Sequence, residues 1–245
     1  MIKVFGSTDC GNVRKQNQDS FIYDIIDDNT AYAVVCDGMG GEKAGDIAST
    51  MACKILEQHL SRSIRAGLSE ITVRNIIQTA LQDANLQIYQ KSVSEESCTG
   101  MGTTVVMVVV MGSKVYFSSI GDSRIYVGNS NGATQLTTDH TVVQVLLARG
   151  EITPEEAETH PKKHFVTKAL GVSCVPDYDY DLYEGFGKEM WVLLCSDGLS
   201  NYITASQLPK LINNVVTAGS TENLMEYANA QGGRDNITAV VIAWR

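Results

Sequence analysis

The sequence predicts a mixed α/β fold in which two stacked β-sheets carry helices on their outer faces. Short apolar runs bounded by turn residues indicate strands, and two long segments place apolar residues at helical spacing. Their order along the chain is strands, a helix pair, more strands and another helix pair. With 245 residues, 44% of them hydrophobic, the chain is long enough for one sizeable core. We therefore expect residues 1–245 to form a single domain.

The first half of the chain contains most of the predicted strands. In order, they cover residues 2–5, 21–26, 31–36, 103–111, 114–120, 123–128 and 134–137. The polar segment 11–20 is predicted as a loop. Apolar residues at helical spacing predict helices over about 44–62 and about 71–89. The change from helical spacing to short β-prone runs after the second helix is what predicts a second group of strands.

The second half of the chain is predicted to be more irregular. Residues 141–149 look helical, and Thr153-Pro154-Glu155-Glu156 has a helix-start signature, with a capping hydroxyl, a proline and acids in the first turn. Residues 157–188 are predicted as mostly irregular. The remaining elements are a buried strand at 190–196, helices at 206–216 and about 221–230, and a last strand at 237–244.

Charge and cysteine content limit the classes of partner and compartment. The net charge is −9 and the pI is about 4.9, which argues against nucleic-acid binding and against anionic membrane surfaces. None of the six cysteines has CxxC or zinc-like spacing, and Cys36 and Cys195 lie in apolar runs, as in a reducing compartment. No signal peptide is apparent, and the longest apolar run, 105–111, is too short to span a bilayer. We expect a cytoplasmic protein.

Acidic residues recur next to predicted strands. AYAVVC leads into Asp37-Gly38, VYFSSI into Gly121-Asp122 and WVLLCS into Asp197-Gly198. Asp235 immediately precedes the last strand, and Asp19 lies in the polar loop before the strand at 21–26. Placed in this way, the acids suggest convergence on one site.

Each acid also has a structural interpretation. Asp-Gly is a common hairpin signal, although no second strand follows Asp37-Gly38. Asp122 lies between two predicted strands and is equally well explained as a turn residue. Asp19 and Asp235 could be ordinary loop acids. Only the joint pattern favours a functional site.

Several carboxylates in one partly desolvated site repel one another, and divalent cations relieve that repulsion. Oxygen ligands without nearby histidine or cysteine suit Mg²⁺ or Mn²⁺ better than zinc. A carboxylate such as Asp37 could bridge two ions at the spacing used for phosphoryl transfer, and the exposed carbonyl of Gly38 is a plausible further ligand.

The motifs along the chain resemble those of the metal-dependent protein phosphatases, the protein phosphatase 2C type. Eight segments match in order. They are Arg14-Lys15-Gln16-Asn17-Gln18-Asp19, Asp37-Gly38-Met39-Gly40-Gly41, Gly102-Thr103-Thr104, Gly121-Asp122-Ser123-Arg124, Thr138-Asp139-His140-Thr141, Lys168-Ala169-Leu170-Gly171, Ser196-Asp197-Gly198-Leu199 and Asp235-Asn236. One such motif is weak evidence, whereas eight in order are highly specific.

The resemblance implies a central β-sandwich of two mostly antiparallel sheets flanked by helix pairs, with a two-metal site at one end. It implies two Mn²⁺ or Mg²⁺ ions, with Asp37 bridging both. The Gly38 carbonyl would bind one ion, while Asp197 and Asp235 would bind the other. Asp19 would act mainly through metal-bound water.

The resemblance also assigns roles to two other residues and to one segment. Asp122 would help to hold a third, weaker ion found in bacterial members. Arg14 would bind the substrate phosphate, for which a planar guanidinium is well suited. Residues 148–188 resemble the family's flap, which borders the active site; a plain surface loop is the alternative.

Two residues leave the source of the leaving-group proton open. Many eukaryotic family members have histidine where this chain has Met39, and that histidine is proposed as the acid. Methionine at this position fits a bacterial-type enzyme and cannot donate a proton. His140 follows Asp139 at an apparent helix start, where a structural role is favoured over that of proton donor.

The sequence thus predicts a serine/threonine protein phosphatase in which a two-metal-activated water attacks phosphorus in a single step. Phosphorylated proteins would be the substrates and a serine/threonine kinase the antagonist. No cysteine lies in a Cys-x5-Arg signature, which argues against a thiol phosphatase. Two alternatives remain: a non-catalytic phosphoprotein-binding protein, and a hydrolase of small phosphorylated metabolites or nucleotides.

Overall fold

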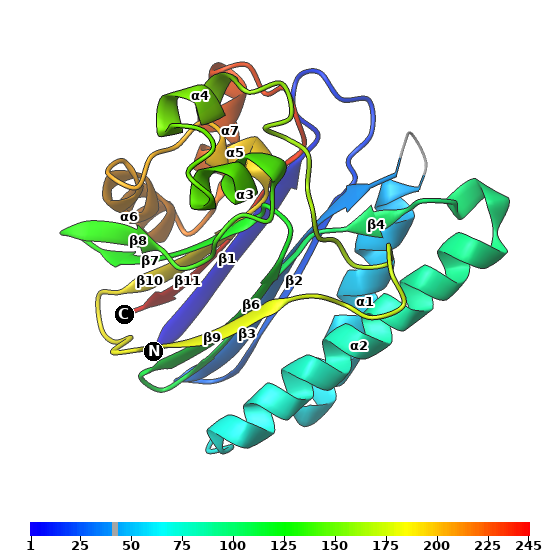
Figure 1. Ribbon diagram of the computed structural model, residues 1–245. Coiled ribbons are helices and arrows are strands. Elements are labelled where there is room, and N and C mark those ends of the chain that lie inside the picture. The colour runs from blue at the N-terminus through cyan, green and yellow to red at the C-terminus, as the bar shows by residue number, and fades with distance from the viewer. Residues whose placement is uncertain (41–43) are drawn as a thin grey trace.

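A computed structural model describes residues 1–40 and 44–245, and in it two β-sheets stack face to face (Figure 1). Gly41 of the predicted glycine-rich stretch lies outside the described residues. All strand pairs within the two sheets are antiparallel. The predicted sandwich of two mostly antiparallel sheets is therefore confirmed.

The strands divide into one sheet of five and one of six. The five-stranded sheet has the order β1 (Ile2–Asp9), β11 (Ile237–Trp244), β10 (Trp191–Cys195), β7 (Arg124–Asn129) and β8 (Gly132–Gln135). The six-stranded sheet has the order β2 (Asp19–Asp27), β3 (Thr30–Met39), β5 (Val105–Met111), β6 (Lys114–Ile120) and β9 (Asp179–Glu184), with β4 (Gly102–Thr103) paired to β3.

Helices cover the outer face of each sheet. The long helices α1 (Gly45–Ser63) and α2 (Glu70–Ser94) cover the six-stranded sheet, and η1 (Glu96–Cys98) follows them. The helices α5 (Asp197–Ser200), α6 (Leu208–Ala218) and α7 (Glu222–Ala230) cover the five-stranded sheet. Two short helices, α3 (Val142–Ala148) and α4 (Pro154–Thr159), lie on the path from β8 to β9, at the top of Figure 1.

The core consists of three apolar layers, because successive side chains of a strand point to opposite faces. In β3, Tyr32 and Val34 pack with α1 and α2, whereas Ala33 and Val35 pack between the sheets. A third layer joins the five-stranded sheet to α5, α6 and α7. Both faces of β3 are thus buried, which accounts for its continuous apolar sequence.

Some element predictions were wrong. Asp19 was predicted to lie in the polar loop 11–20, but it is the first residue of β2. β3 does not end before Asp37 but continues to Met39, because Asp37 pairs with Asp19 of β2 and Met39 pairs with Gly102 of β4. The segment predicted as irregular, 157–188, contains β9, which pairs with β6. The predicted start of α4 is confirmed, since Thr153 and Glu156 form a complete capping box.

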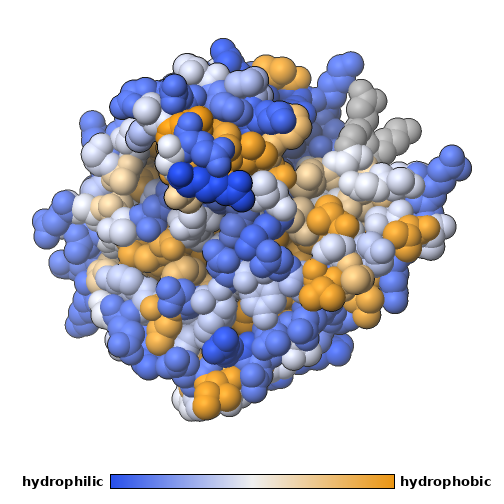
Figure 2. Space-filling model, in the orientation of Figure 1, coloured by the Kyte–Doolittle hydropathy of each residue, from blue (hydrophilic) through white to orange (hydrophobic). Residues whose placement is uncertain are grey.

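On the face shown in Figure 2, hydrophilic residues predominate and apolar residues occur in small groups between them, as expected for a chain of net charge −9. In the described residues, no helix combines the length and the apolar character needed to cross a membrane.

Candidate active site

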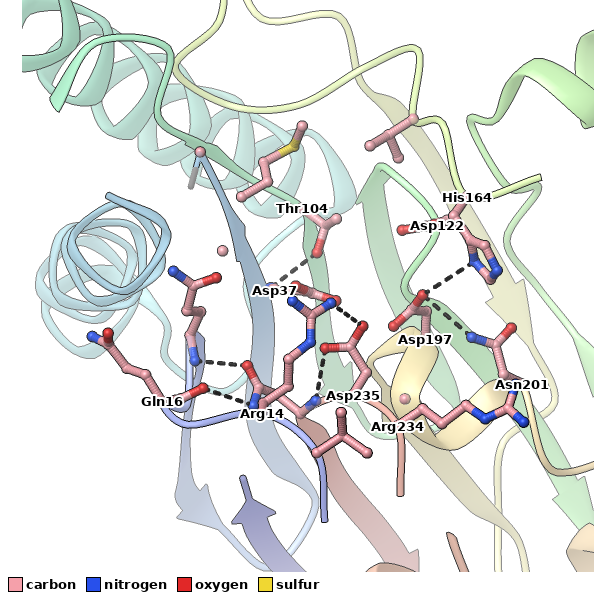
Figure 3. A pocket seen from close by; sticks show the side chains of 18 of the residues that line it. Arg14, Gln16, Asp37, Thr104, Asp122, His164, Asp197, Asn201, Arg234 and Asp235 are labelled. Atoms are coloured by element: carbon pink, nitrogen blue, oxygen red, sulfur yellow. Dashed lines mark hydrogen bonds and ion pairs between the residues drawn. The ribbon is translucent and has the colours of Figure 1, made fainter. Parts of the chain in front are cut away.

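A cavity of about 1080 Å³ opens at one end of the sandwich. Six residues predicted from the sequence line it, namely Arg14, Asp37, Gly38, Asp122, Asp197 and Asp235. They come from the β1–β2 loop, from β3, from the turn between β6 and β7, from the start of α5 and from the loop before β11. Figure 3 shows the four carboxylates and Arg14 gathered in this cavity. The structure therefore brings together residues that the sequence separates widely.

Asp37 is held through its backbone. Its amide donates to the hydroxyl of Thr104 at 3.0 Å. Its carbonyl oxygen accepts from the Thr103 hydroxyl at 2.9 Å and from the Thr104 amide at 2.8 Å. These bonds leave the carboxylate free to face the cavity from a rigid strand.

Gly38 permits a close approach between β3 and the start of α1. A Cβ atom added at Gly38 would lie 2.0 Å from the carbonyl oxygen of Gly45. The Gly38 amide also donates to the carbonyl of Gln18 at 3.1 Å. Only glycine fits between these backbones, and the strand therefore reaches the cavity without a side chain at this position.

Asp19 lies behind the cavity rather than on its wall, opposite Asp37 in the β2–β3 pair. Its Oδ2 accepts from the hydroxyls of Ser196 and Thr238, each at 2.7 Å. Its buried Oδ1 has no hydrogen-bond partner in the described residues. Burial raises the pKa of Asp19 to about 7, although both hydroxyl bonds act to lower it.

Asp235 and Arg14 form an ion pair. An Arg14 guanidinium nitrogen donates to Asp235 Oδ2 at 2.7 Å, and 53% of the Arg14 side chain is exposed. The bond to Asp235 raises the pKa of Arg14 above its ordinary value, with smaller contributions from Asp37 and Asp197. Arg14 thus interacts with the carboxylates of the cavity, as Figure 3 shows for Asp235.

Asp197 begins the short helix α5. Its Oδ2 accepts from the side-chain amide of Asn201 at 3.3 Å and lies 3.9 Å from Nδ1 of His164. Burial is the largest cause of a raised Asp197 pKa, followed by the charge of Asp235, while the contact with His164 acts in the opposite direction. A carboxylate at a helix start is favoured by the helix dipole, so the fold supports this position.

Burial and mutual repulsion disfavour the ionised forms of the remaining carboxylates. The pKa of Asp37 is raised well above its ordinary value, first by burial and then by Asp19 and Asp197. The pKa of Asp122 is raised to about 7, first by burial and then by Asp197. This arrangement is costly for a protein without a counter-charge.

The donor set fits divalent cations. The carboxylates supply only oxygen, and the buried Oδ1 of Asp19 has no hydrogen-bond partner in the described residues. Across residues 1–40 and 44–245, however, no three His, Cys, Asp or Glu side chains are arranged as a ligand group. Asp235, one of the predicted metal ligands, is paired with Arg14, the predicted phosphate-binding residue.

Asn236 is a site residue to which sequence reasoning assigned no role. Its Oδ1 accepts from the amide of Gln18 at 2.9 Å, and its Nδ2 donates to the carbonyls of Cys10 and Gln16, each at 3.0 Å. It thereby fixes the loop that carries Arg14. Its place beside Asp235 in a matched motif was the available signal.

The rim of the cavity carries cations and Met39. Lys15, Lys163, His164 and Arg234 line it, and Met39 lines it from the end of β3. His140 is not part of this lining; it is 8% exposed and bonds to the Gly121 amide. The structural interpretation of His140 is therefore favoured over that of a proton donor. Cys36 and Cys195 are free and buried, as expected.

Comparison with known proteins gives a consistent family assignment. The model of the protein phosphatase 2C family matches residues 10–240. The serine/threonine phosphatase stp of Listeria monocytogenes serotype 4b (strain F2365) is 35% identical over 236 residues, which cover 96% of this chain and 93% of that protein.

Solved structures match over nearly the whole chain. The serine/threonine phosphatase of S. agalactiae aligns with a TM-score of 0.89 at 28% identity and covers 100% of both chains. The catalytic domain of the serine/threonine protein phosphatase PstP, solved in complex with two manganese ions, aligns with a TM-score of 0.83 at 32% identity. That alignment covers 99% of this chain and 97% of the PstP chain.

Proposed function

This chain belongs to the protein phosphatase 2C family of metal-dependent serine/threonine protein phosphatases, in its bacterial form. We propose that its cavity is the active site and that it hydrolyses phosphoserine and phosphothreonine. The observation that carries the proposal is the set of partly buried carboxylates facing one cavity with a guanidinium among them.

The residues that would hold the cations are those predicted from the sequence. Asp37 and the Gly38 carbonyl, with Asp197 and Asp235, would hold two Mn²⁺ or Mg²⁺ ions; Asp122 would hold a third and weaker ion. The bound ions supply an activated water and neutralise charge on the phosphoryl group. Asp19, behind Asp37, supports the site from the second strand of the pair, and its unpartnered Oδ1 is available to a water molecule.

Arg14 would bind the phosphate of the substrate. Its guanidinium is half exposed and already lies next to the carboxylates where the phosphoryl group has to be held. A phosphate dianion offers it a bidentate partner in place of Asp235. Substrate binding would thus exchange one anionic partner of Arg14 for another, and release Asp235 for its own role.

The leaving serine or threonine oxygen needs a proton. Met39 lines the cavity where a histidine would serve as the acid, and a thioether has no proton to give. His164 is the histidine on the cavity wall, with 60% of its side chain exposed. We propose water and His164 as the candidate proton donors; Lys15, Lys163 and Tyr202 also line the cavity.

The wider role of the protein follows from this reaction. We propose that its substrates are phosphorylated proteins and that a serine/threonine kinase opposes it. We propose further that it works in the cytoplasm and that residues 1–245 act as one catalytic domain. The family assignment and the position of the cavity at one end of a single sandwich support these proposals.

The test is phosphate release from a phosphothreonine peptide by purified protein with Mn²⁺, and after treatment with EDTA. We expect release with Mn²⁺, loss with EDTA and recovery on adding the metal back. Full activity of a metal-stripped sample would contradict the two-metal proposal. Faster turnover of phosphorylated metabolites or nucleotides than of any phosphopeptide, in a parallel panel, would favour the small-molecule alternative.

A further inference from the structure

Two of the matched motifs, Gly121-Asp122-Ser123-Arg124 and Thr138-Asp139-His140-Thr141, lie against each other beside the cavity. In the turn after β6, the Gly121 amide donates to Nδ1 of His140 at 3.1 Å, and the Gly121 carbonyl accepts from the His140 amide at 2.9 Å. Next to this contact, Arg124 pairs with Asp139 at 2.7 Å. The segment that contains His140 is therefore fixed to the turn that carries Asp122.

The partners of His140 determine which of its nitrogens carries the proton. Nδ1 accepts from a backbone amide, so in the neutral ring the proton is on Nε2. Nε2 lies 3.1 Å from Oδ2 of Asp179 and donates to it. The imidazole is buried. Its Nδ1 edge contacts the turn at Gly121, and its Nε2 edge contacts the start of β9.

The turn at Gly121 has little freedom on its other side. Gly121 has a φ of +99°, and a Cβ atom there would lie 2.5 Å from a methyl carbon of Thr104. The Thr104 hydroxyl pairs with the Ser123 hydroxyl at 2.8 Å and also accepts from the amide of Asp37. Asp122 therefore has a fixed residue on each side. Ser123 is bonded to Thr104, which also binds the Asp37 amide, and the Gly121 amide is bonded to His140.

The Asp179 side of the imidazole belongs to residues 148–188, here called the flap segment. The Thr167 amide donates to the carbonyl of His140 at 2.7 Å. Lys168 lies 3.0 Å from Asp177 and 3.6 Å from Asp179. The flap segment thus touches His140 in its middle and again where it becomes β9.

We propose that His140 is a positioning residue with two separable tasks: its Nδ1 edge holds Asp122 in place for a cation, and its Nε2 edge holds the end of the flap segment. The assignment of a cation to Asp122 rests on the proposed function. The hydrogen bonds on both edges of the ring do not.

Two substitutions separate the two edges. In His140→Asn, the amide oxygen takes the place of Nδ1 and keeps an acceptor for Gly121, but the donor to Asp179 is lost. In His140→Gln, the amide nitrogen reaches the place of Nε2 and keeps that donor, while the acceptor is lost. His140→Leu removes both and serves as the reference for complete loss.

Three measurements read the outcome on the intact protein. Calorimetric titration with Mn²⁺ alone gives the affinity of the weakest site, and Asp122→Asn identifies which site that is. Hydrogen exchange of β9, residues 179–184, reports the end of the flap segment, because this strand pairs with β6. A thermal melt shows whether a variant is generally destabilised.

A crossed pattern is expected. His140→Asn should keep the weak-site affinity within about threefold and speed exchange in β9, at residues 179–184. His140→Gln should keep slow exchange and weaken the weakest site about tenfold, towards the value of Asp122→Asn. Asp179→Ala should reproduce the exchange pattern of His140→Asn with an unchanged Mn²⁺ titration.

Other patterns overturn the proposal. If the weak-site Mn²⁺ affinity and the hydrogen exchange change together in His140→Asn and in His140→Gln, His140 is an ordinary core residue. The same conclusion follows if the two variants leave affinity and exchange unchanged. The proposed function fails separately, by absent phosphopeptide hydrolysis in the wild type, because none of these three readouts depends on turnover.

Discussion

Arg14 forms an ion pair with Asp235 in the cavity, and its assigned task is to bind phosphate. Arg14→Ala should lower kcat/KM. The loss of transition-state stabilisation should be about 2 to 4 kcal/mol, the scale for one charge-assisted contact in a transition state. Mn²⁺ affinity should not fall, since the substitution frees Asp235. Lys15→Ala is the matched control, because the neighbouring lysine also lines the cavity but lacks the planar guanidinium. Calorimetry that shows lost metal binding in Arg14→Ala would mean that the arginine has another role.

Met39 allows a test of how the leaving group is protonated. Nitrophenolate leaves with little acid help, whereas a threonine alkoxide needs much more. Met39→His should therefore leave kcat for p-nitrophenyl phosphate nearly unchanged and raise the single-turnover rate for a phosphothreonine peptide. The gain should stay below the general range of about 10²- to 10⁴-fold for acid catalysis, and it should fade above the pKa of the new histidine.

The outcome also bears on His164. An unchanged single-turnover rate for the peptide would show that another donor is in place. A wild-type rate that already falls sharply as the pH rises past a pKa would show the same. His164 is then the side chain to replace, because it lines the cavity and His140 does not.

The sequence predicted which acids gather, but not how each is held. Asp37, Asp122, Asp197 and Asp235 were predictable from their places beside strands, because strand ends bring residues to one edge of a sheet. The Arg14–Asp235 pair joins residues 221 positions apart, and no local pattern encodes it. The same holds for the support of Asp19 by hydroxyls from two other strand ends.

At the scale of elements, the contact between β3 and α1 can be tested at Gly38. Gly38→Ala places a methyl group 2.0 Å from the Gly45 carbonyl, so the strand or the helix has to shift. We expect destabilisation of at least about 1 to 3 kcal/mol, the scale for overpacking, and loss of Mn²⁺ binding. Urea denaturation and calorimetry measure the two effects.

Gly132→Ala is the control for that substitution. Gly132 lies in a strand too, but nothing is within 4 Å of a Cβ atom there. The free energy of unfolding of Gly132→Ala should differ from that of the wild type by no more than about 0.5 kcal/mol. Equal stability of the two variants would show that β3 and α1 are not in the tight contact described here.

Element boundaries show where local sequence is insufficient. β9 was missed because Asp179 and Asp181 are poor strand formers; it exists because β6 offers an open edge for pairing. β3 extends beyond its apolar residues for a related reason, because β2 and β4 pair with its last residues. The helix start at Thr153 was predictable, because a capping box is local chemistry.

At the scale of the whole molecule, the carboxylate cluster predicts how stability depends on pH. Burial raises the pKa of Asp19 and of Asp122 to about 7, whereas an unfolded aspartate titrates near 4. Between these values the folded protein binds more protons, so the free energy of unfolding falls as pH rises. The metal-free protein should therefore lose a few kcal/mol of stability between about pH 4 and pH 7, and Mn²⁺ should restore it.

Asp37→Asn supplies the control for this effect. It removes one charge from the cluster, so the metal-free variant should melt at least as high as the wild type at pH 8 and vary less with pH. It should also lose Mn²⁺ binding and activity. Thermal melts in EDTA from about pH 4 to pH 8 measure both proteins, and a wild-type melting temperature that stays level or rises across this range would contradict the prediction.

The pairing of β1 with β11 has a consequence for biosynthesis. Ile2 lies opposite Trp244, and β11 separates β1 from β10 in the five-stranded sheet. A nascent chain leaving the ribosome therefore carries β1 without its partner until β11 emerges, and long-range pairing of this kind is slow to form. The same late step brings Asp235 to Arg14. We therefore expect nascent chains that lack β11 to be inactive, because the proposed catalytic centre needs Asp235, which immediately precedes that strand.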